Sequence, residues 1–283
     1  MRPVLTAKKA ELALAFLQSH PQSAAALLEQ QPMQDVALFL GGVPSSYAAP
    51  VLETMLPQYT AKLCFHLETE MVAGFLSRMD ISMAAAVLRH LTPSLRKTLL
   101  GLLSETNSLS CKLLLDYSED QIGAWMLVEA ATLPVECTVS TALTRISDNE
   151  ADADVIYVVD RSGQIQGVVT LAHLLRSSTE TSVTAVMRPT PEPISGRTNL
   201  IAAHEHKGWL AADTLPVINR HQQLVGCIRH VDLRKGMEQL DTHIDTPQGS
   251  DPLSSMLEIY GGSLLALFGA AGDLIGMESR GRS

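Results

Sequence analysis

Apolar residues recur at helical spacing through most of the first 117 positions. One stripe has the i, i+3, i+4, i+7, i+8 spacing of a single helix face and consists of Ala48, Val51, Leu52, Met55 and Leu56. Similar stripes occur over residues 84–91 and 95–103, and prolines separate the segments. Thr92 followed by Pro93 has the pattern of an N-cap with proline in the first turn. The pattern predicts an all-α superhelix or bundle of short helical hairpins between about residues 10 and 117.

A different pattern appears twice near the middle of the chain. Residues 157–169 and 215–228 each contain a β-branched run, a polar turn and a second apolar run entered through glycine, which is typical of a β-hairpin. Gly167 and Gly226 occupy the same place in the two copies and lie 59 residues apart. Helical patterns precede the hairpins at 141–146 and 200–207 and follow them at 171–176 and 231–240. The repeat predicts two copies of one α/β unit that pack together.

These patterns predict a multidomain chain with an α-helical superhelix followed by a tandem α/β pair. We expect a helical domain with an acidic connector at residues 1–132, repeat units at 133–187 and 188–241, and a tail at 242–283. The tail turns apolar, since Asp273 is the only charged residue between Glu258 and Glu278. An apolar helix is predicted there, which could span a membrane, lie at an interface or bind a partner, or dock on the chain's own core.

Charge and cysteine content limit the classes of partner and the cellular compartment that we expect. A net charge of −9 and a pI near 5.4 argue against nucleic acid as a partner. The four cysteines form no C-x-x-C pair and the N-terminus has no signal peptide, so we expect free thiols in the cytoplasm, with the tail allowing a peripheral position at the inner face of the membrane. The sequence has no glycine-rich phosphate loop, G-x-S-x-G elbow or Cys/His nucleophile pair, and we predict that the protein is not an enzyme.

The repeat resembles a tandem CBS-domain pair, and the helical region resembles the N domain of MgtE-type magnesium transporters. The stretch 117–126 is similar to the acidic linker of that family, which ends in Gly-x-x-Met. Residues 157–160 and 167–171 match the first CBS half, 183–187 match its exit, and 215–218 with 224–226 match the second half. The resemblance covers about residues 20–240.

The resemblance implies a cytosolic homodimer that senses Mg²⁺ through acidic clusters and passes the signal along a connecting helix to a membrane pore. The chain ends soon after that helix, so we expect a regulatory protein without the pore, which would act on a membrane transporter or another protein through its C-terminal apolar helix. The candidate Mg²⁺ ligands are Asp80, Asp116, Glu119, Asp120, Asp152, Asp154 and Asp232. Val231, Lys235 and Arg229 stand where the family pattern favours acids or neutral residues, which weakens a cation site. Solvated loops remain the alternative for the acids of the connector and of the first CBS half.

CBS pairs also bind adenosine nucleotides with a hydroxyl residue and an aspartate three positions later. The first copy has Thr170, but His173 replaces the aspartate; the second has Asp232, but Arg229 replaces the hydroxyl. Thr170, Asp232 and Arg229 are therefore the candidate nucleotide ligands, with Arg229 able to meet a phosphate. The alternatives to a Mg²⁺-sensing regulator are a nucleotide sensor and a protein-interaction scaffold without ligand; the helical domain also loosely resembles parts of the flagellar rotor protein FliG.

Overall fold

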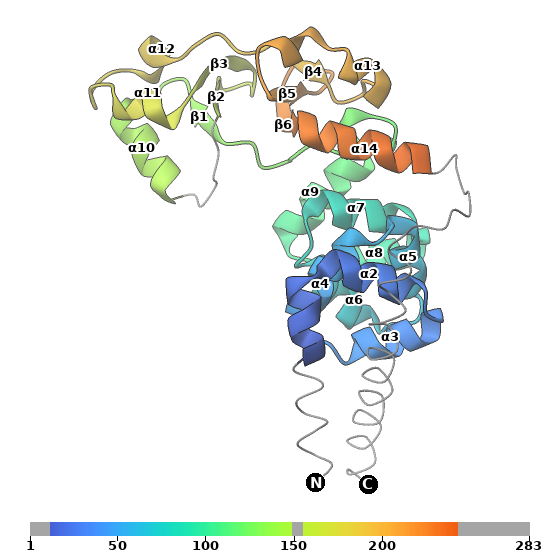
Figure 1. Cartoon of the computed structure of the whole chain (residues 1–283). Coiled ribbons are helices and arrows are strands. Elements are labelled where there is room, and N and C mark those ends of the chain that lie inside the picture. The colour runs from blue at the N-terminus through green and yellow to red at the C-terminus, as the bar shows by residue number, and fades with distance from the viewer. Residues whose placement is uncertain (1–11, 149–154, 243–283) are drawn as a thin grey trace. The chain divides into compact units, whose positions relative to one another are not determined.

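The computed structural model describes residues 12–148 and 155–242, which divide into two compact units, one up to Lys112 and one from Leu113 onward (Figure 1). The predicted helix of the tail therefore lies outside the described residues, as do Asp152 and Asp154. No helix within the described ranges is both long and apolar enough to cross a membrane.

The first unit is built from short helices joined by tight turns. They are α2 (Pro21–Glu29), α3 (Met33–Gly41), α4 (Ser45–Thr54), α5 (Pro57–Cys64), α6 (Thr69–Leu76), α7 (Ile81–Arg89), α8 (Pro93–Leu102) and α9 (Glu105–Leu115), the last of which runs on into the second unit. Helices contact the next but one along the chain, so that α2, α4, α6 and α8 form one row and α3, α5 and α7 another. This packing confirms the predicted helical superhelix.

A 12-residue period underlies this superhelix. The residues that precede the helices follow at that interval: His20, Pro32, Pro44, Leu56, Glu68, Asp80 and Thr92. Alanine recurs at one position inside successive helices, and each copy is buried: Ala25, Ala37, Ala49, Ala61, Ala73 and Ala85. A methyl group is the smallest side chain that keeps helix propensity high, so it suits a position where helices approach closely.

Two of the predicted helical stripes extend too far. Leu56 is 47% exposed and precedes α5 with an extended backbone, and Leu102 is 48% exposed at the end of α8. The residue before a proline avoids the helical conformation, so Pro57 ends the stripe of α4 before Leu56. The predicted cap at Thr92 is confirmed, because its hydroxyl oxygen accepts a hydrogen bond from Leu95 N at 3.5 Å and Pro93 opens α8.

The second unit contains two halves of the same design. The first half has β1 (Thr132–Pro134), α10 (Val139–Asp148), β2 (Ile156–Val159), β3 (Ile165–Val169), α11 (Leu171–Leu175) and α12 (Val183–Val186). The second has β4 (Ile194–Ser195), α13 (Leu200–His204), the 3₁₀ helix η2 (Lys207–Leu210), β5 (Thr214–Ile218), β6 (Leu224–Arg229) and α14 (His230–Thr242). Each forms a three-stranded sheet in which the first strand runs parallel to the second and a hairpin supplies the third. The predicted combination of a helical superhelix and an α/β pair is thus confirmed.

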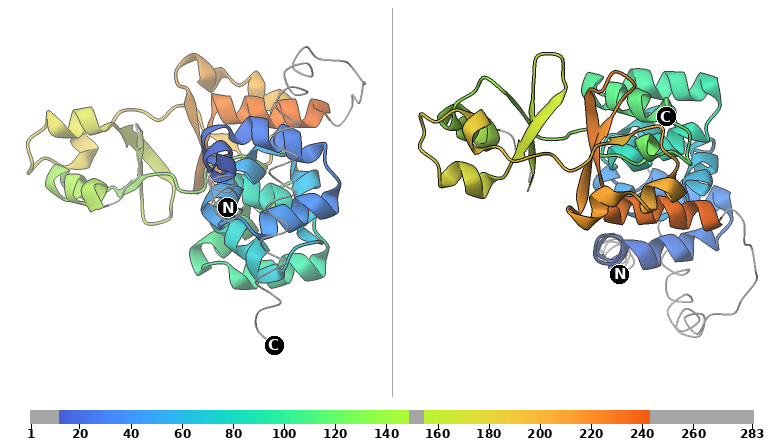
Figure 2. Two further views of the ribbon diagram at one scale, coloured as in Figure 1. Left: turned by 60° about the horizontal axis from the view of Figure 1, so that its bottom comes forward. Right: turned by 90° about the horizontal axis from the view of Figure 1, so that it is seen from above.

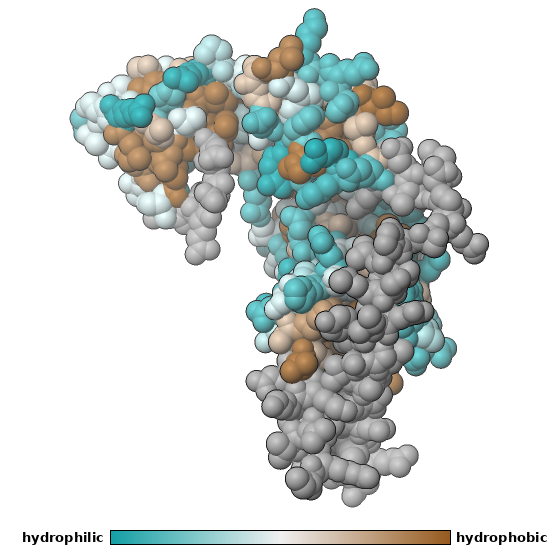
Figure 3. Space-filling view, viewed as in Figure 1, coloured by the Kyte–Doolittle hydropathy of each residue, from teal (hydrophilic) through white to brown (hydrophobic). Residues whose placement is uncertain are grey.

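Helices cover one face of the first sheet and close its core (Figure 2). Apolar side chains from all three strands pack there against α10, α11 and α12: Leu133, Val139, Ala142, Ile156, Val158, Val169, Leu174 and Val183. Other apolar side chains of this unit stay on the surface (Figure 3), notably Leu171 and Leu175 on α11, Ile201 on α13 and Val231 on α14.

The turns of the two hairpins have the same side-chain-to-backbone hydrogen bonds. The Asp160 side chain accepts hydrogen bonds from the backbone N–H groups of Ser162 and Gln164 at 2.8 and 3.1 Å, and Asn219 does the same for His221 and Gln223 at 2.8 and 3.0 Å. The turns need a left-handed residue, which is Gly163 in the first half and Gln222 in the second, with φ of 80° and 62°. The turn chemistry predicted at these positions is confirmed.

Candidate functional site

The first candidate nucleotide position, Thr170, is engaged within its own half. It caps α11, and its hydroxyl oxygen accepts a hydrogen bond from His173 N at 3.4 Å. The same oxygen lies 3.0 Å from His173 Nδ1. The hydroxyl thus bonds to the residue that stands where an aspartate would chelate a ribose. This half offers a ligand an imidazole in place of a carboxylate.

The second candidate position is an ion pair at the junction of β6 and α14. Arg229 donates from Nε to Asp232 Oδ2 at 2.5 Å and from Nη2 to Oδ1 at 3.1 Å. Lys235 Nζ lies 3.6 Å from Asp232 Oδ1, and the carboxylate side chain is only 13% exposed. Because a bidentate guanidinium occupies both carboxylate oxygens, a cation or a ribose would have to displace Arg229 to reach Asp232.

In the first unit the structure brings a second acid to Asp80. The Asp80 carboxylate caps α7 by accepting from Ser82 N at 2.8 Å, while Glu53 Oε1 accepts from Asp80 N at 2.5 Å. Glu29 makes the equivalent contact to Leu56 N at 3.3 Å, 24 residues earlier. Sequence reasoning missed Glu53, although the 12-residue period points to it. Glu29 and Glu53 thus accept a hydrogen bond from the backbone N–H group of the residue that precedes a later helix.

The connector acids lie in one turn, which we call the acidic turn (residues 116–120). Asp120 Oδ2 accepts from Asn199 Nδ2 at 3.0 Å, and its carbonyl oxygen accepts from Leu200 N at 2.8 Å. The carbonyl oxygen of Glu119 accepts from Trp125 Nε1 at 2.7 Å. Next to Asp116, burial raises the pKa of the Tyr117 hydroxyl; Arg197 opposes the rise and Asp116 adds to it. The turn is thus held against the second half.

Five of the predicted Mg²⁺ ligands lie among the described residues: Asp80, Asp116, Glu119, Asp120 and Asp232. Within residues 12–148 and 155–242, no group of three or more histidine, cysteine or acidic side chains is arranged to hold a metal ion. Asp80 lies in the first unit, whereas Asp116, Glu119, Asp120 and Asp232 lie in the second.

The connector also supplies a structural element that sequence reasoning missed. Ile122 N and Gly123 N donate to Thr198 O and Gly196 O at 2.9 and 2.8 Å, and Leu127 exchanges two backbone hydrogen bonds with Cys227. In the first half, residues 183–188 make the matching bonds: Val183 N donates to Cys137 O, and Arg188 pairs with Val168. Ile122–x₃–Met126 is therefore the counterpart of Val183–x₃–Met187, and this likeness was visible in the sequence. The connector completes the second half rather than merely leading to the first.

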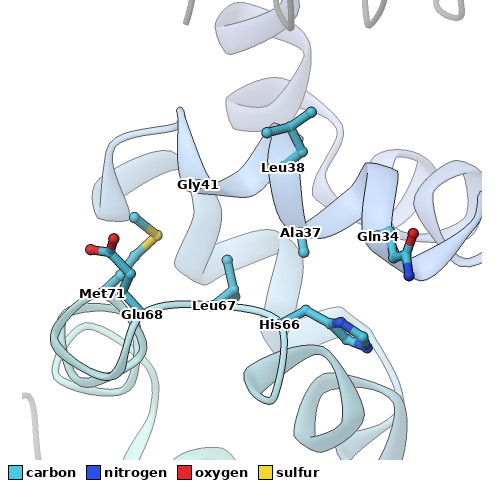
Figure 4. Close-up of a pocket in the computed structure, with 8 residues that line it drawn as sticks. All are labelled: Gln34, Ala37, Leu38, Gly41, His66, Leu67, Glu68 and Met71. Carbon is cyan, nitrogen blue, oxygen red and sulfur yellow. The ribbon is translucent and has the colours of Figure 1, made fainter. Parts of the chain in front are cut away.

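A shallow pocket of about 490 Å³ lies in the first unit between α3 and the start of α6 (Figure 4). Ala37, Leu38, Leu67 and Met71 give it apolar walls, while Gln34, His66 and Glu68 lie around them. These side chains do not combine a nucleophile with a base.

The four cysteines are buried and free. Burial raises the pKa of Cys64 to about 12 and those of Cys111 and Cys227 to about 11. The thiol, rather than the reactive thiolate, is therefore the form present at neutral pH. Structural thiols, as predicted, fit these positions.

Comparisons with known proteins match both parts of the chain. Residues 19–120 match the family model of the MgtE intracellular N domain, and residues 122–180 match that of the CBS domain. The magnesium transporter MgtE of Thermus thermophilus is 27% identical over 229 residues, which is 77% of this chain and 50% of that protein. The uncharacterized protein YtoI of Bacillus subtilis is 27% identical over 100 residues, 35% of this chain and 22% of YtoI. This chain thus spans at most about half the length of these relatives.

Solved structures show the same fold. The cytosolic domain of the Mg²⁺ channel MgtE in complex with ATP has a TM-score of 0.70 at 24% identity, covering 83% of this chain and 98% of that one. The soluble part of a magnesium transporter has a TM-score of 0.57 at 17% identity, covering 83% and 99%.

Proposed function

We propose that this chain, in which a match to the MgtE intracellular N domain precedes a match to the CBS domain, is the cation-sensing regulatory part of a magnesium-transport system. The order of the two modules carries this proposal. The matched families are those of a transporter's regulatory region rather than of an enzyme.

The acidic turn is the place in the second unit where we propose that Mg²⁺ acts. Asp116, Glu119 and Asp120 are three acidic residues within five positions of the sequence, and the contacts to Asn199, Leu200 and Trp125 hold the turn in place. Mg²⁺ keeps several waters and needs only one or two protein carboxylates, so a full cage of ligands is not required. Neutralising these charges would relieve their mutual repulsion.

We further propose that the protein is a cytoplasmic homodimer that acts on a membrane transporter. Exposed apolar side chains on helices of both halves favour self-association: Leu175 is 66% exposed on α11 and Ile201 is 68% exposed on α13. A charged variant, Leu175→Glu with Ile201→Glu, should shift the protein toward monomer in sedimentation analysis if these faces pair. An unchanged oligomeric state would reject them as the dimer surface.

The test of the proposed function is a Mg²⁺ titration followed by small-angle scattering and by limited proteolysis of residues 116–133. Compaction and protection at millimolar Mg²⁺, not reproduced by monovalent salt of equal ionic strength, are expected. A variant with Asp116→Asn, Glu119→Gln and Asp120→Asn should lose the response. The matched control removes the same charge elsewhere, with Glu68→Gln before α6, Glu70→Gln in α6 and Glu105→Gln in α9. This control variant should keep the response to Mg²⁺. No response in the wild-type chain would overturn the proposal.

An adenosine nucleotide is the second candidate ligand. The related MgtE cytosolic domain was solved in complex with ATP, and this chain keeps Asp232. The Tyr157 hydroxyl is buried and has no hydrogen-bond partner among the described residues. Burial raises its pKa, and Cys227 of the second half raises it further. A buried donor without an acceptor is costly, and a ligand polar atom would satisfy it. Calorimetry with ATP should detect binding that Asp232→Ala abolishes; no heat with the wild-type chain would reject this candidate.

A further inference from the structure

Three glycines of the second half make room for bulky residues of the connector. A Cβ added to Gly196 would lie 2.8 Å from Tyr117 Cε1, and one added to Gly226 would meet the Leu127 carbonyl oxygen. A Cβ on Gly236, in the middle of α14, would lie 2.9 Å from Cδ2 of Trp125. Contacts this short are not seen for real Cβ atoms, so each position requires glycine for the connector to pack as it does.

The Trp125 contact reaches α14 directly. Because Gly236 has no side chain, the indole ring packs against the helix where a side chain would otherwise stand, and Leu200 approaches the same point, 3.1 Å from an added Cβ. The first turn of α14 is fixed separately: His230 N donates to Asp213 O at 2.9 Å, and Asp232 is bound by Arg229. The indole thus holds the helix beyond its anchored start.

The same indole is also bound to the acidic turn. Its Nε1–H donates to the Glu119 carbonyl oxygen at 2.7 Å. The next residue, Asp120, is tied through its own carbonyl oxygen to Leu200 N, so the turn, the indole and Leu200 form one connected group. The described residues of the first half form no such arrangement, because Val186 stands where the second half has Trp125 and α11 ends at Leu175.

We propose that Trp125 is a positioning residue that couples the acidic turn to helix α14, so that a displacement of the turn moves the helix. The proposal deepens the proposed function, since it rests on the acidic turn as the place where the cation acts. The coupling itself is a property of the contacts between residues 119, 125 and 236 and exists without any cation. It can therefore be tested separately.

The experiment uses the full chain in chelator, with peptide-resolved amide hydrogen exchange as the measurement. In the wild-type chain, Asp120→Asn weakens the contact to Asn199 and should speed exchange both in the acidic turn and in residues 230–238. Trp125→Phe keeps a ring on Gly236 but removes the N–H donor to Glu119. In that background Asp120→Asn should still speed exchange in the turn and should no longer change exchange in α14. If Trp125 only filled space, Asp120→Asn would still speed exchange in α14 in the Trp125→Phe background.

Gly236→Ala tests the packing of the Trp125 indole against α14. The added methyl group should displace Trp125, speed exchange in α14 and in the acidic turn by about tenfold or more, and shift the emission of Trp125 when Trp209→Phe leaves it as the only tryptophan. Gly101→Ala is the matched control, because Gly101 lies in α8 with nothing within 4 Å of an added Cβ, and neither signal should change.

Two results would overturn the coupling: exchange in α14 that ignores Asp120→Asn in the wild-type background, or transfer that survives Trp125→Phe. If the coupling holds in chelator and Mg²⁺ has no effect, only the proposed function fails. If Mg²⁺ compacts the protein and the coupling is absent, only this inference fails.

Discussion

The two CBS halves have the same strand order, the same bulge beside Val158 and Val217, and the same hydrogen-bonded turn at Asp160 and Asn219. They differ in the segment that closes each sheet. The first half uses residues 183–188, which follow its own hairpin, whereas the second uses residues 122–127, which precede the whole pair. The chain that leaves the helical unit therefore closes the sheet of the second half before it enters β1 of the first half.

The halves also differ at the helix that follows each hairpin. Thr170 and His173 form a hydrogen-bonded pair, while Arg229 and Asp232 form an ion pair at the equivalent positions. The two halves thus share the fold and differ in chemistry at the candidate nucleotide positions. Substitutions at equivalent positions of the two halves can measure how much each difference contributes to stability and to ligand binding.

The largest loss of stability is expected from a substitution at Gly226, against which the connector backbone packs. Gly226→Ala should destabilise the second half by more than about 3 kcal/mol, because the carbonyl group of Leu127 cannot yield. Gly167→Ala in the first half should cost less, about 1–3 kcal/mol. An added Cβ there would lie 2.8 Å from Met187 Sδ, which is on a flexible side chain, and 2.9 Å from the Arg188 carbonyl oxygen, which is farther than the Leu127 carbonyl oxygen lies from a Cβ on Gly226. Urea unfolding measures both, with Gly101→Ala as a helical control that should stabilise by about 0.5–1 kcal/mol. A larger loss for Gly167→Ala would contradict the comparison.

A somewhat smaller effect is expected from the side chains that anchor the two closing segments. Ile122 and Val183 are both fully buried at equivalent positions. Ile122→Ala and Val183→Ala should each cost roughly 2–3 kcal/mol through the cavity they leave. Amide exchange should place the first loss in β5 and β6 and the second in β2 and β3. Loss of protection in the first half on Ile122→Ala would show that the connector does not belong to the second half.

The ion pair in the second half should limit nucleotide binding. Arg229→Thr frees Asp232 from the guanidinium and sets a hydroxyl three residues before it, so ATP affinity should rise about tenfold, or ~1.4 kcal/mol. His173→Asp is the matching change in the first half, where it restores an aspartate three residues after Thr170. Calorimetry compares both with the unchanged chain. If neither substitution alters ATP binding, these positions do not limit it.

The smallest difference is a pH dependence confined to the first hairpin. Hydrogen bonds from the Ser162 side chain and from Gln164 N hold the pKa of the exposed Asp160 carboxyl below its usual value. Its contribution to stability is present above the usual value, and is lost as the pH falls below about 4 through the lowered pKa. Asn219 does not titrate, so amide exchange in acid should speed in β2–β3 more than in β5–β6, and Asp160→Asn should remove the difference. Equal responses in the two hairpins would refute it.

The sequence predicted what depends on local pattern. Hairpins at 157–169 and 215–228, the cap at Thr92 and the buried thiols follow from spacing and residue type. The 12-residue period is equally readable in the sequence, since alanine recurs from Ala25 to Ala85, but it becomes apparent only when successive helices are compared. The apolar spacing places Leu56 on the stripe of α4, whereas Pro57 ends that stripe before it.

Long-range pairing explains what was missed at the candidate site. The i, i+3 spacing of Arg229 and Asp232 favours an ion pair between them. The low exposure of the Asp232 side chain, however, depends on tertiary packing. Nothing local indicates that Ile122 pairs with Thr198 or that Trp125 lies on Gly236, because these contacts join segments far apart in the chain. A comparison of Ile122–x₃–Met126 with Val183–x₃–Met187 was the one available signal.

The most direct measurement of cation sensing is amide hydrogen exchange of the full chain with and without millimolar Mg²⁺, at matched ionic strength. If Mg²⁺ acts at the acidic turn, exchange should slow in residues 116–127 and in α14 together, with the β2–β3 hairpin of the first half unchanged. Exchange that is the same in both conditions, or that slows only in the first half, would contradict it.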